Sequence, residues 1–374
     1  MKYIAFFDVP EIKSENRYVN AAARGVIEYM IKVFSSIESV EVLSPGRTLN
    51  HNGIYHKKTV NVSENVTIRF PFTFGVKSKI GRLLSLLWTQ AWLFSYLFFH
   101  TKRGEKVVFY HSLSLMTIIS VLCKIKGIQP ILEFREIYSD INKVSKRLTR
   151  KEHTYYQCAY GYIFPSDAIR RILGVNDKPY VLAPGSYSVH RVTQEEFHDG
   201  KIHCVYAGNL RKDKGGAYLA ADAAEYLSDQ YIIHILSGSY SEKAIEEFQK
   251  EIEKISQKTK CRILFEGGKY GEEFFAFLNK CDIGLATQND GDFSNTSFPS
   301  KILTYLGCGL CVIAPPIDAV RLSPISNLVT EYKDFDPTIV AEAIIGIDSK
   351  GNDTRLELEK LHYDLVSSVK TMIA

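Results

Sequence analysis

Two loops of the sequence carry residue types that bind phosphate. The first is VYAGNLRKDKGG, in which Arg211, Lys212 and Lys214 lie between glycines that follow an apolar run. Glycine lets the backbone approach a ligand, and a helix starting near Gly216 would add free N–H groups and a partial positive charge. We predict a phosphate site here; a solvated basic turn is the alternative. The loop fits neither the Walker A nor the G-x-G-x-x-G pattern, which disfavours an ATPase or a common dinucleotide site.

The second loop contains the run FPSK. Proline is favoured in a first helical turn, so Pro299 predicts another helix amino terminus, with Ser300 and Lys301 beside it. The hydroxyl, the cation and the free amides there would bind a second phosphate. Two such termini in one domain would hold a diphosphate, whereas the alternative is that FPSK only starts a helix.

The first half of the chain offers acid–base candidates after predicted strands. These are His111 in VVFYHS, and Glu133 and Glu136 in ILEFREIYSD. A general base must reach the proton of an attacking hydroxyl, and a histidine or a carboxylate can serve. For each residue alone, a structural salt bridge or a capped turn is an equally good interpretation. Together they predict a polar rim at the edge of a sheet.

Strand and helix signals alternate along the whole chain, which is typical of doubly wound, mostly parallel sheets. A polar run over 50–75 interrupts the first series and predicts an inserted hairpin. In the first series, the predicted strands are Tyr3–Phe7, Val40–Leu43, Val107–Tyr110, Ile131–Phe134, Tyr162–Phe164 and Tyr180–Leu182. The predicted helices are Asn20–Phe34 and Leu83–Phe99. The second-series strands are His203–Tyr206, Ile232–Leu236, Ile263–Phe265, Ile283–Ala286 and Cys311–Ile313, with helices from Ala217, Glu242, Glu272 and Ser300.

We therefore expect two Rossmann-like domains. The first, 1–187, would bind an acceptor, and after a polar linker, 188–200, the second, 201–350, would bind a nucleotide sugar. A helix over 351–374 is expected to pack back onto the first domain. Parallel sheets bind ligands at the carboxyl ends of their strands, so the ligand is expected in a cleft between the two domains.

The segment Val205–Pro316 resembles the donor-binding domain of GT-B glycosyltransferases, particularly the family-four retaining enzymes of bacterial polysaccharide biosynthesis. Their G-R-L-x-x-x-K-G loop matches Gly208, Leu210, Lys214 and Gly215, with Asn209 in place of the arginine. The resemblance implies that Gly208, Asn209, Arg211, Lys214, Ser300 and Lys301 bind the donor diphosphate.

The family's E-x7-E motif is altered in this chain. Its phenylalanine and proline match Phe298 and Pro299, and that register places Thr296 and Thr304 where the two glutamates would be. The resemblance implies that these threonines contact the nucleotide or the sugar, and that Tyr270 borders the base. His111 falls where related enzymes often carry a histidine near the donor sugar.

The resemblance implies a GT-B fold, α/β, with two Rossmann-like doubly wound domains facing across a cleft. It also implies sugar transfer with retention from a nucleotide sugar, UDP-sugar favoured, to a saccharide or lipid-linked saccharide. An inverting reaction would use His111, Glu133 or Glu136 as the base. We expect no cofactor and no metal, because lysines and helix termini supply the positive charge, and we interpret Asp290-Gly291-Asp292 as a polar loop.

Two other functions remain open. Loss of both motif glutamates would suit an inactive pseudo-glycosyltransferase that acts as a partner subunit, and a GT-B epimerase breaks the same bond without an acceptor. The net charge of +4 and the absence of nucleic-acid motifs disfavour a nucleic-acid partner. Seven scattered cysteines favour a reducing compartment, so we expect a cytoplasmic protein. The apolar stretch Leu83–Phe99, flanked by lysines and arginines, predicts either a core helix or peripheral contact with the inner membrane surface.

Overall fold

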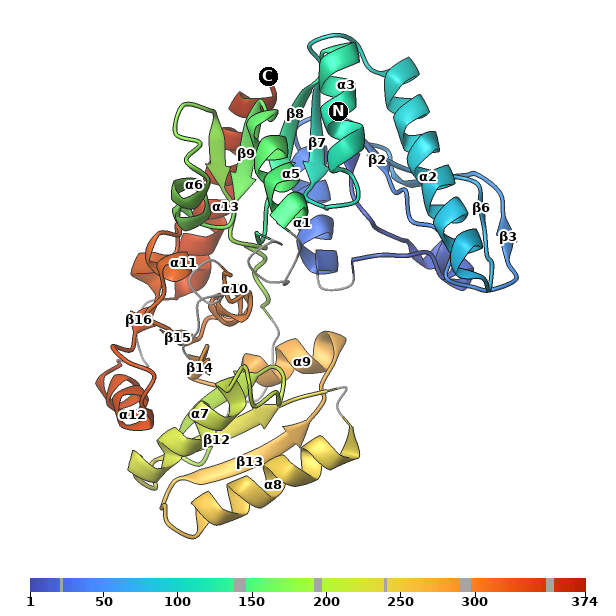
Figure 1. Cartoon of the computed structure of the whole chain (residues 1–374). Helices are drawn as coiled ribbons and strands as arrows, with labels where there is room; N and C mark the ends of the chain where they lie inside the picture. The colour runs from blue at the N-terminus through green and yellow to red at the C-terminus, as the bar shows by residue number, and fades with distance from the viewer. Residues whose placement is uncertain (21–22, 138–145, 192–196, 239–240, 289–296, 348–352) are drawn as a thin grey trace. The chain divides into compact units, whose positions relative to one another are not determined.

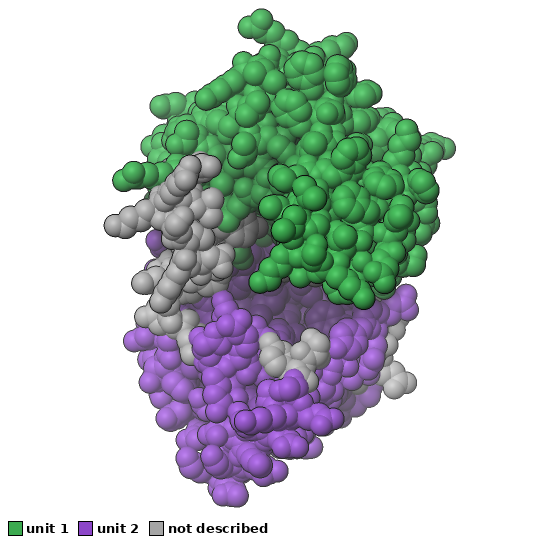
Figure 2. All heavy atoms as spheres, turned by 45° about the vertical axis from the view of Figure 1, so that its right-hand side comes forward, with its two compact units in different colours: residues 1–186, 364–374 green, residues 187–363 purple. Residues whose placement is uncertain are grey.

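A computed structural model of the chain describes residues 1–20, 23–137, 146–191, 197–238, 241–288, 297–347 and 353–374. The chain divides into two compact units (Figures 1 and 2). Unit 1 consists of 1–186 together with 364–374, and unit 2 consists of 187–363.

Unit 1 is built on one sheet, for which the described residues supply eight strands in the order β10-β9-β8-β7-β1-β2-β5-β4. All neighbouring strands are parallel except β4 and β5. The strands are β1 (Lys2–Ile4), β2 (Val40–Leu43), β4 (Lys58–Ser63), β5 (Val66–Phe70), β7 (Lys106–Tyr110), β8 (Gln129–Glu133), β9 (Gly161–Phe164) and β10 (Tyr180–Leu182). A separate pair joins β3 (Ile54–Tyr55) to β6 (Thr73–Phe74). The helices are α1 (Arg24–Ser35), α2 (Lys79–His100), α3 (Met116–Lys126), α5 (Lys146–Gln157) and α6 (Asp167–Leu173).

Two details of unit 1 differ from the sequence prediction. The expected strand Tyr3–Phe7 ends at Ile4, because the Phe7 N–H turns away to the Ser44 hydroxyl, 3.1 Å distant. The expected hairpin is present as β4 and β5, but β5 also pairs in parallel with β2. The hairpin therefore extends the main sheet rather than standing apart from it.

Side chains of β1 show how the sheet of unit 1 is covered on both faces. Ile4 packs with buried residues of α2 and α3 on one face. Tyr3 points to the other face, where its ring meets Phe34 of α1 edge-on at 5.2 Å. Alternation along a strand therefore supplies both layers of the core.

Unit 2 contains a fully parallel sheet, for which the described residues supply six strands in the order β13-β12-β11-β14-β15-β16. Numbered from β11, this is the 3-2-1-4-5-6 order of a Rossmann fold. The strands are β11 (Ile202–Ala207), β12 (Tyr231–Leu236), β13 (Arg262–Gly267), β14 (Ile283–Leu285), β15 (Cys311–Ala314) and β16 (Thr330–Glu331). The helices are α7 (Gly216–Asp222), α8 (Glu242–Ser256), α9 (Gly271–Leu278), α10 (Lys301–Gly307), α11 (Asp318–Arg321), α12 (Pro337–Gly346) and α13 (Thr354–Ile373).

The last helix, α13, belongs to both units. Its first part lies in unit 2, where Arg355 contacts Asn279 and the Cys308 carbonyl. Its last part lies in unit 1, and a Cβ placed on Gly161 of β9 would stand 3.4 Å from the Met372 sulfur. Val369 is fully buried, so this end of α13 is part of the core of unit 1.

Helix α2 exposes an apolar stripe at its amino-terminal half. Ile80, Leu83, Leu84, Leu87 and Trp88 are each at least 49% exposed, and their spacing places them along one side of the helix. The opposite side packs on the core through Leu93 and Leu97. Within the described residues, no helix is long and apolar enough to span a membrane.

Candidate functional site

The two sheets each have a point where the strand order reverses, and open α/β sheets bind ligands there. In unit 2 this point lies between β11 and β14, and in unit 1 it lies between β1 and β7.

The loop after β11 runs from Gly208 to Gly215 and enters α7. Gly215 has a φ of 64°, a conformation that favours glycine, and it caps the helix. A Cβ on Gly208 would stand 2.8 Å from both the Lys301 ammonium and the Tyr206 hydroxyl. The absence of a side chain at Gly208 is therefore what lets the lysine amine lie against this loop.

Lys301 is the first residue of α10 and is half-buried. Its Nζ lies 3.6 Å from the centroid of the Tyr206 ring. Burial lowers the pKa of Lys301 to about 7. No carboxylate among the described residues forms an ion pair with it. A desolvated cation beside a glycine loop is a strong position for an anion.

Two hydroxyl groups fix the backbone around this lysine, and the sequence analysis did not single out either. The Tyr305 hydroxyl of α10 accepts a 2.7 Å hydrogen bond from the Ala207 N–H at the end of β11. The Thr287 hydroxyl, which follows β14, donates to the Gly216 carbonyl at 2.7 Å. These bonds join the ends of β11 and β14 to α10 and α7. The sequence signal for Thr287 is its place directly after the predicted strand Ile283–Ala286, whereas Tyr305 lies inside a helix and no local pattern marks it.

The other residues of the first loop have different surroundings. The exposed Arg211 pairs with Asp213 and holds the pKa of that carboxyl below its usual range. The Asn209 carbonyl accepts from the Tyr206 hydroxyl at 3.2 Å, and its side-chain oxygen accepts from the Arg211 N–H at 3.3 Å. Lys214 is half-buried on the same loop. Lys301, rather than Arg211, is therefore the cation that lies against Gly208.

Residues of the second predicted loop lie at the start of α10 or inside it. Ser300 caps the helix without a side-chain hydrogen bond, and Thr304 lies half-buried one turn into it. Thr296 and the DGD run Asp290–Asp292 lie outside the described residues. Both α7 and α10 are only 7 residues long, so each contributes few aligned peptide dipoles and the lysines supply most of the positive charge. Among the described residues, no cluster of three or more histidines, cysteines or carboxylates could hold a metal ion.

Tyr270 lies on a floor of glycines at the carboxyl ends of β12 and β13. A Cβ on Gly238 would stand 2.0 Å from the Tyr270 hydroxyl oxygen, and one on Gly268 would stand 2.8 Å away. The side chain is nevertheless 67% exposed. The hydroxyl end of the ring thus lies against the glycines, while most of the side chain is accessible to a flat ligand.

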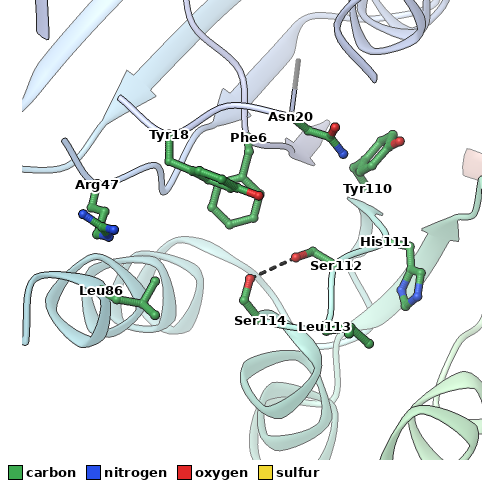
Figure 3. Close-up of a pocket in the computed structure, with 10 residues that line it drawn as sticks. All are labelled: Phe6, Tyr18, Asn20, Arg47, Leu86, Tyr110, His111, Ser112, Leu113 and Ser114. Atoms are coloured by element: carbon green, nitrogen blue, oxygen red, sulfur yellow. Dashed lines mark hydrogen bonds between the residues drawn. The ribbon is translucent and has the colours of Figure 1, made fainter. Parts of the chain in front are cut away.

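Unit 1 holds a pocket of about 400 Å³ at its own reversal point (Figure 3). Figure 3 shows the Phe6 and Tyr18 rings together, with Arg47 and Leu86 toward one side and Tyr110 and His111 toward the other. The lining residues are Phe6, Tyr18, Asn20, Arg47, Leu86, Tyr110, His111, Ser112, Leu113 and Ser114. Most of them follow β1, β2 or β7, so the pocket lies at the carboxyl ends of three adjacent strands.

Of the three acid–base candidates, only His111 lines this pocket. Its Nε2 lies 3.1 Å from the Glu152 carboxylate of α5, and burial lowers the pKa of His111. Glu133 is fully buried, accepts from the Tyr3 hydroxyl at 2.7 Å and pairs with Arg135 at 2.6 Å. These bonds give Glu133 a structural place inside the sheet, and Glu136 is half-buried beyond the same strand.

Comparison with solved structures identifies the architecture, whereas no family model and no curated protein matches the sequence. The chain aligns with Escherichia coli trehalose-6-phosphate synthase bound with UDP-2-fluoro glucose at a TM-score of 0.61 and 9% identity, covering 100% of this chain and 96% of that one. It aligns with Anabaena HepE in complex with UDP and glucose at 0.61 and 12% identity, covering 100% and 97%. The chain has the GT-B fold.

A further GT-B match is the trehalose-phosphate synthase of Burkholderia xenovorans in complex with glucose-6-phosphate, with a TM-score of 0.60, 10% identity, and coverage of 99% and 96%. All three alignments extend over nearly the whole of both chains. The predicted GT-B fold class is therefore confirmed, while the low identities carry the fold alone.

Proposed function

We propose that this protein is a glycosyltransferase that moves a sugar from a nucleotide diphosphate sugar to a saccharide or lipid-linked saccharide. The observation that carries the proposal is the Lys301 ammonium, which lies without a carboxylate partner among the described residues beside Gly208 at the reversal point of a GT-B fold. Neighbours of the same fold are described with UDP, UDP-2-fluoro glucose, glucose and glucose-6-phosphate, which supports a UDP-sugar as donor.

In the proposed reaction, Lys301 and Lys214 stabilise the negative charge that develops on the departing diphosphate. Such stabilisation needs no covalent intermediate, because preformed charges act where charge appears in the transition state. Retention follows if the acceptor hydroxyl attacks on the face from which the diphosphate departs and gives its proton to that leaving group. Tyr270 would stack against the base.

The test is a calorimetric titration of the whole protein with UDP, GDP, CMP and several UDP-sugars, with and without EDTA. We expect one nucleoside diphosphate to bind regardless of EDTA, and Lys301→Gln to weaken it by roughly thirtyfold or more, as when one partner of a buried charge pair is removed. Lys243→Gln is the matched control, since Lys243 is an exposed lysine on α8 of the same unit.

The outcome of this titration separates the candidate functions. Binding of no nucleotide would favour the inactive partner subunit, and conversion of a UDP-sugar in the absence of any acceptor would favour the epimerase. If Lys243→Gln and Lys301→Gln weaken nucleotide binding equally, the assignment of the phosphate site to Lys301 is wrong. Where sugar transfer is observed, nuclear magnetic resonance of the product reports whether the anomeric configuration is retained.

We also propose surface polysaccharide assembly as the setting, with the protein in the cytoplasm and in peripheral contact with the inner membrane. The exposed stripe of α2 supports this, because Lys77, Lys79 and Arg82 lie around its start and no acidic residue occurs from 65 to 104. Apolar residues flanked by cations bind the interface of anionic bilayers.

Flotation with vesicles tests this contact. We expect binding to vesicles that contain phosphatidylglycerol and little binding to phosphatidylcholine alone. The double change Leu83→Ser with Leu87→Ser is expected to abolish it, whereas Ile172→Ser, at an equally exposed position on α6, is the control. Equal flotation of both variants would refute the assignment of this stripe.

A further inference from the structure

The pocket of unit 1 has the size of a ligand site and a lining that selects among ligands. Its volume of about 400 Å³ lies within the range of about 300–1,000 Å³ that small-molecule sites occupy. It is formed within unit 1 alone, at the carboxyl ends of β1, β2 and β7. The chemistry of its walls therefore bears on what unit 1 binds.

One wall of the pocket is aromatic. The Phe6 and Tyr18 rings meet edge-on at 5.3 Å and an interplanar angle of 78°. Tyr18 is 49% exposed, so much of its surface is available to a ligand. Aromatic rings offer an apolar face to the C–H groups of a sugar, while Asn20 and Ser112 offer hydrogen bonds to its hydroxyls.

The charge of the pocket comes from Arg47, on the loop after β2. Its Nη1 donates to the Thr48 carbonyl at 3.0 Å, which leaves other guanidinium donors available. No described residue forms an ion pair with Arg47, and none of the lining residues is acidic. Two carboxylates of the segment between Phe6 and Tyr18 are already engaged, Asp8 by Arg24 and Glu15 by Arg17.

We infer that this pocket binds an acidic saccharide, one that carries a phosphate, a diphosphate or a carboxylate, and that Arg47 recognises the acidic group. The guanidinium is planar and presents parallel donors that match a phosphate or a carboxylate. The inference rests on the proposed function, for which it names the acceptor class. Arg47 is then a specificity-determining residue, while the aromatic wall holds the sugar ring.

Leu86 connects the pocket to the surface of the protein. It lines the pocket from α2, the helix whose Leu83 and Leu87 are exposed. An acidic saccharide linked to a lipid through phosphate could therefore place its lipid along that stripe. A free sugar phosphate would satisfy Arg47 equally well, so the two sources have to be separated by experiment.

The experiment is calorimetry of the whole protein with glucose, glucose 6-phosphate, glucuronic acid and a farnesyl diphosphate-linked N-acetylglucosamine. We expect each acidic probe to bind roughly tenfold or more tightly than glucose, because a hydrogen bond to a charged group outweighs a neutral one. Tighter binding of the farnesyl-linked probe than of glucose 6-phosphate would identify the lipid-linked source, and the reverse would identify the free sugar.

Variants assign the preference to Arg47. Arg47→Gln is expected to remove the advantage of the acidic probes, and Arg47→Lys to keep much of it. Arg103→Gln, a change of an exposed arginine of unit 1 that does not line the pocket, should leave it unchanged. Should Arg47→Gln unfold, the salt dependence of wild-type binding decides, since only charge recognition weakens as salt is added.

Equal binding of glucose and the acidic probes, or a preference that survives in Arg47→Gln, would overturn the inference. UDP titration of the same samples keeps the two proposals apart. Loss of UDP binding with retained binding of acidic sugars contradicts the proposed function alone. Retained UDP binding with no preference for acidic sugars contradicts only the assignment of the pocket.

Discussion

The reversal points of the two sheets occupy equivalent places in the strand order but are lined by different kinds of residues. In unit 2, a glycine loop meets Lys301, whose amine is desolvated against the Tyr206 ring. In unit 1, the equivalent place is an aromatic pocket in which Arg47 is half-buried. In the unit 2 site, the Tyr305 and Thr287 hydroxyls hold the backbone, one by accepting from the Ala207 N–H and the other by donating to the Gly216 carbonyl, whereas side chains form the walls of the unit 1 pocket.

The difference suits the two partners of a transfer reaction. A leaving diphosphate develops charge, and a fixed cation in a poorly hydrated place stabilises that charge without rearrangement. An acceptor has to be held by shape and distinguished from similar sugars. The aromatic walls of the pocket provide the shape, and the Arg47 guanidinium distinguishes acidic sugars from neutral ones. If rigidity and charge divide between the units in this way, substitutions at the two sites should affect stability and binding differently.

The largest effect is expected from Gly216→Ala in the rigid site. The new Cβ would stand 2.4 Å from the Thr287 carbonyl oxygen, a backbone atom that cannot move away alone. We expect unit 2 to be destabilised by about 3 kcal/mol, as for overpacking of a core. Chemical denaturation measures this loss, and an unchanged unfolding midpoint would show that the site is less rigid than the structure indicates.

In unit 1, Glu152→Ala is expected to destabilise the fold by about 1–3 kcal/mol. The change removes the carboxylate 3.1 Å from the buried His111 ring, and loss of a buried hydrogen bond leaves part of the desolvation cost uncompensated. UDP affinity should be unchanged, because the proposed nucleotide site lies in unit 2. A matched loss of UDP affinity would contradict the division between the two units.

Proton concentration should affect the nucleotide site through Lys301, whose pKa burial lowers to about 7. The amine is charged below that pKa and neutral above it, so affinity for a nucleoside diphosphate should fall as pH rises from 7 to 9. A decrease of roughly tenfold is expected, in a range where the phosphate, with a pKa near 6, stays ionised. Lys301→Arg should flatten the profile, since arginine stays charged throughout.

The smallest effect should come from Gly208→Ala. Its Cβ would stand 2.8 Å from the Lys301 amine, which ends a flexible side chain and can move aside, and 2.8 Å from the hydroxyl of the buried Tyr206 ring. We therefore expect a loss of stability of about 1 kcal/mol, at the low end of overpacking, while UDP affinity falls several-fold because the ammonium leaves its place. Calorimetry and thermal unfolding of the same variant measure both quantities. A large loss of stability would mean that this loop, too, is rigid.

Much of the fold follows from the periodicity of the sequence. The strands Val40–Leu43 and Tyr180–Leu182 and the start of the helix at Glu242 agree with the predicted bounds. Continuous apolar runs between glycines and polar turns identify buried parallel strands, since both faces of such a sheet are covered. The GT-B class was predicted from the glycine loop and the FPSK run in the correct order.

The sites were harder to predict because they depend on residues far apart in the chain. Glu133 looked available for acid–base chemistry, but Tyr3 of β1, which is two strands away from β8 in the sheet and 130 positions away in the sequence, donates a hydrogen bond to it. Arg47 escaped notice because it follows a strand that nothing else marked as functional. The order of strands in the sheet decides which residues become neighbours, and no local sequence pattern predicts that order.

The division of α13 between the units affects how the protein is made. Ribosomes add residues in order, and domains commonly begin to fold as soon as they emerge. Unit 2 ends at residue 363, whereas the core of unit 1 still needs Val369 and Met372. Unit 1, whose synthesis begins first, is therefore the last unit to be complete. Until the end of α13 has been synthesised, Gly161 of β9 lacks its contact with Met372.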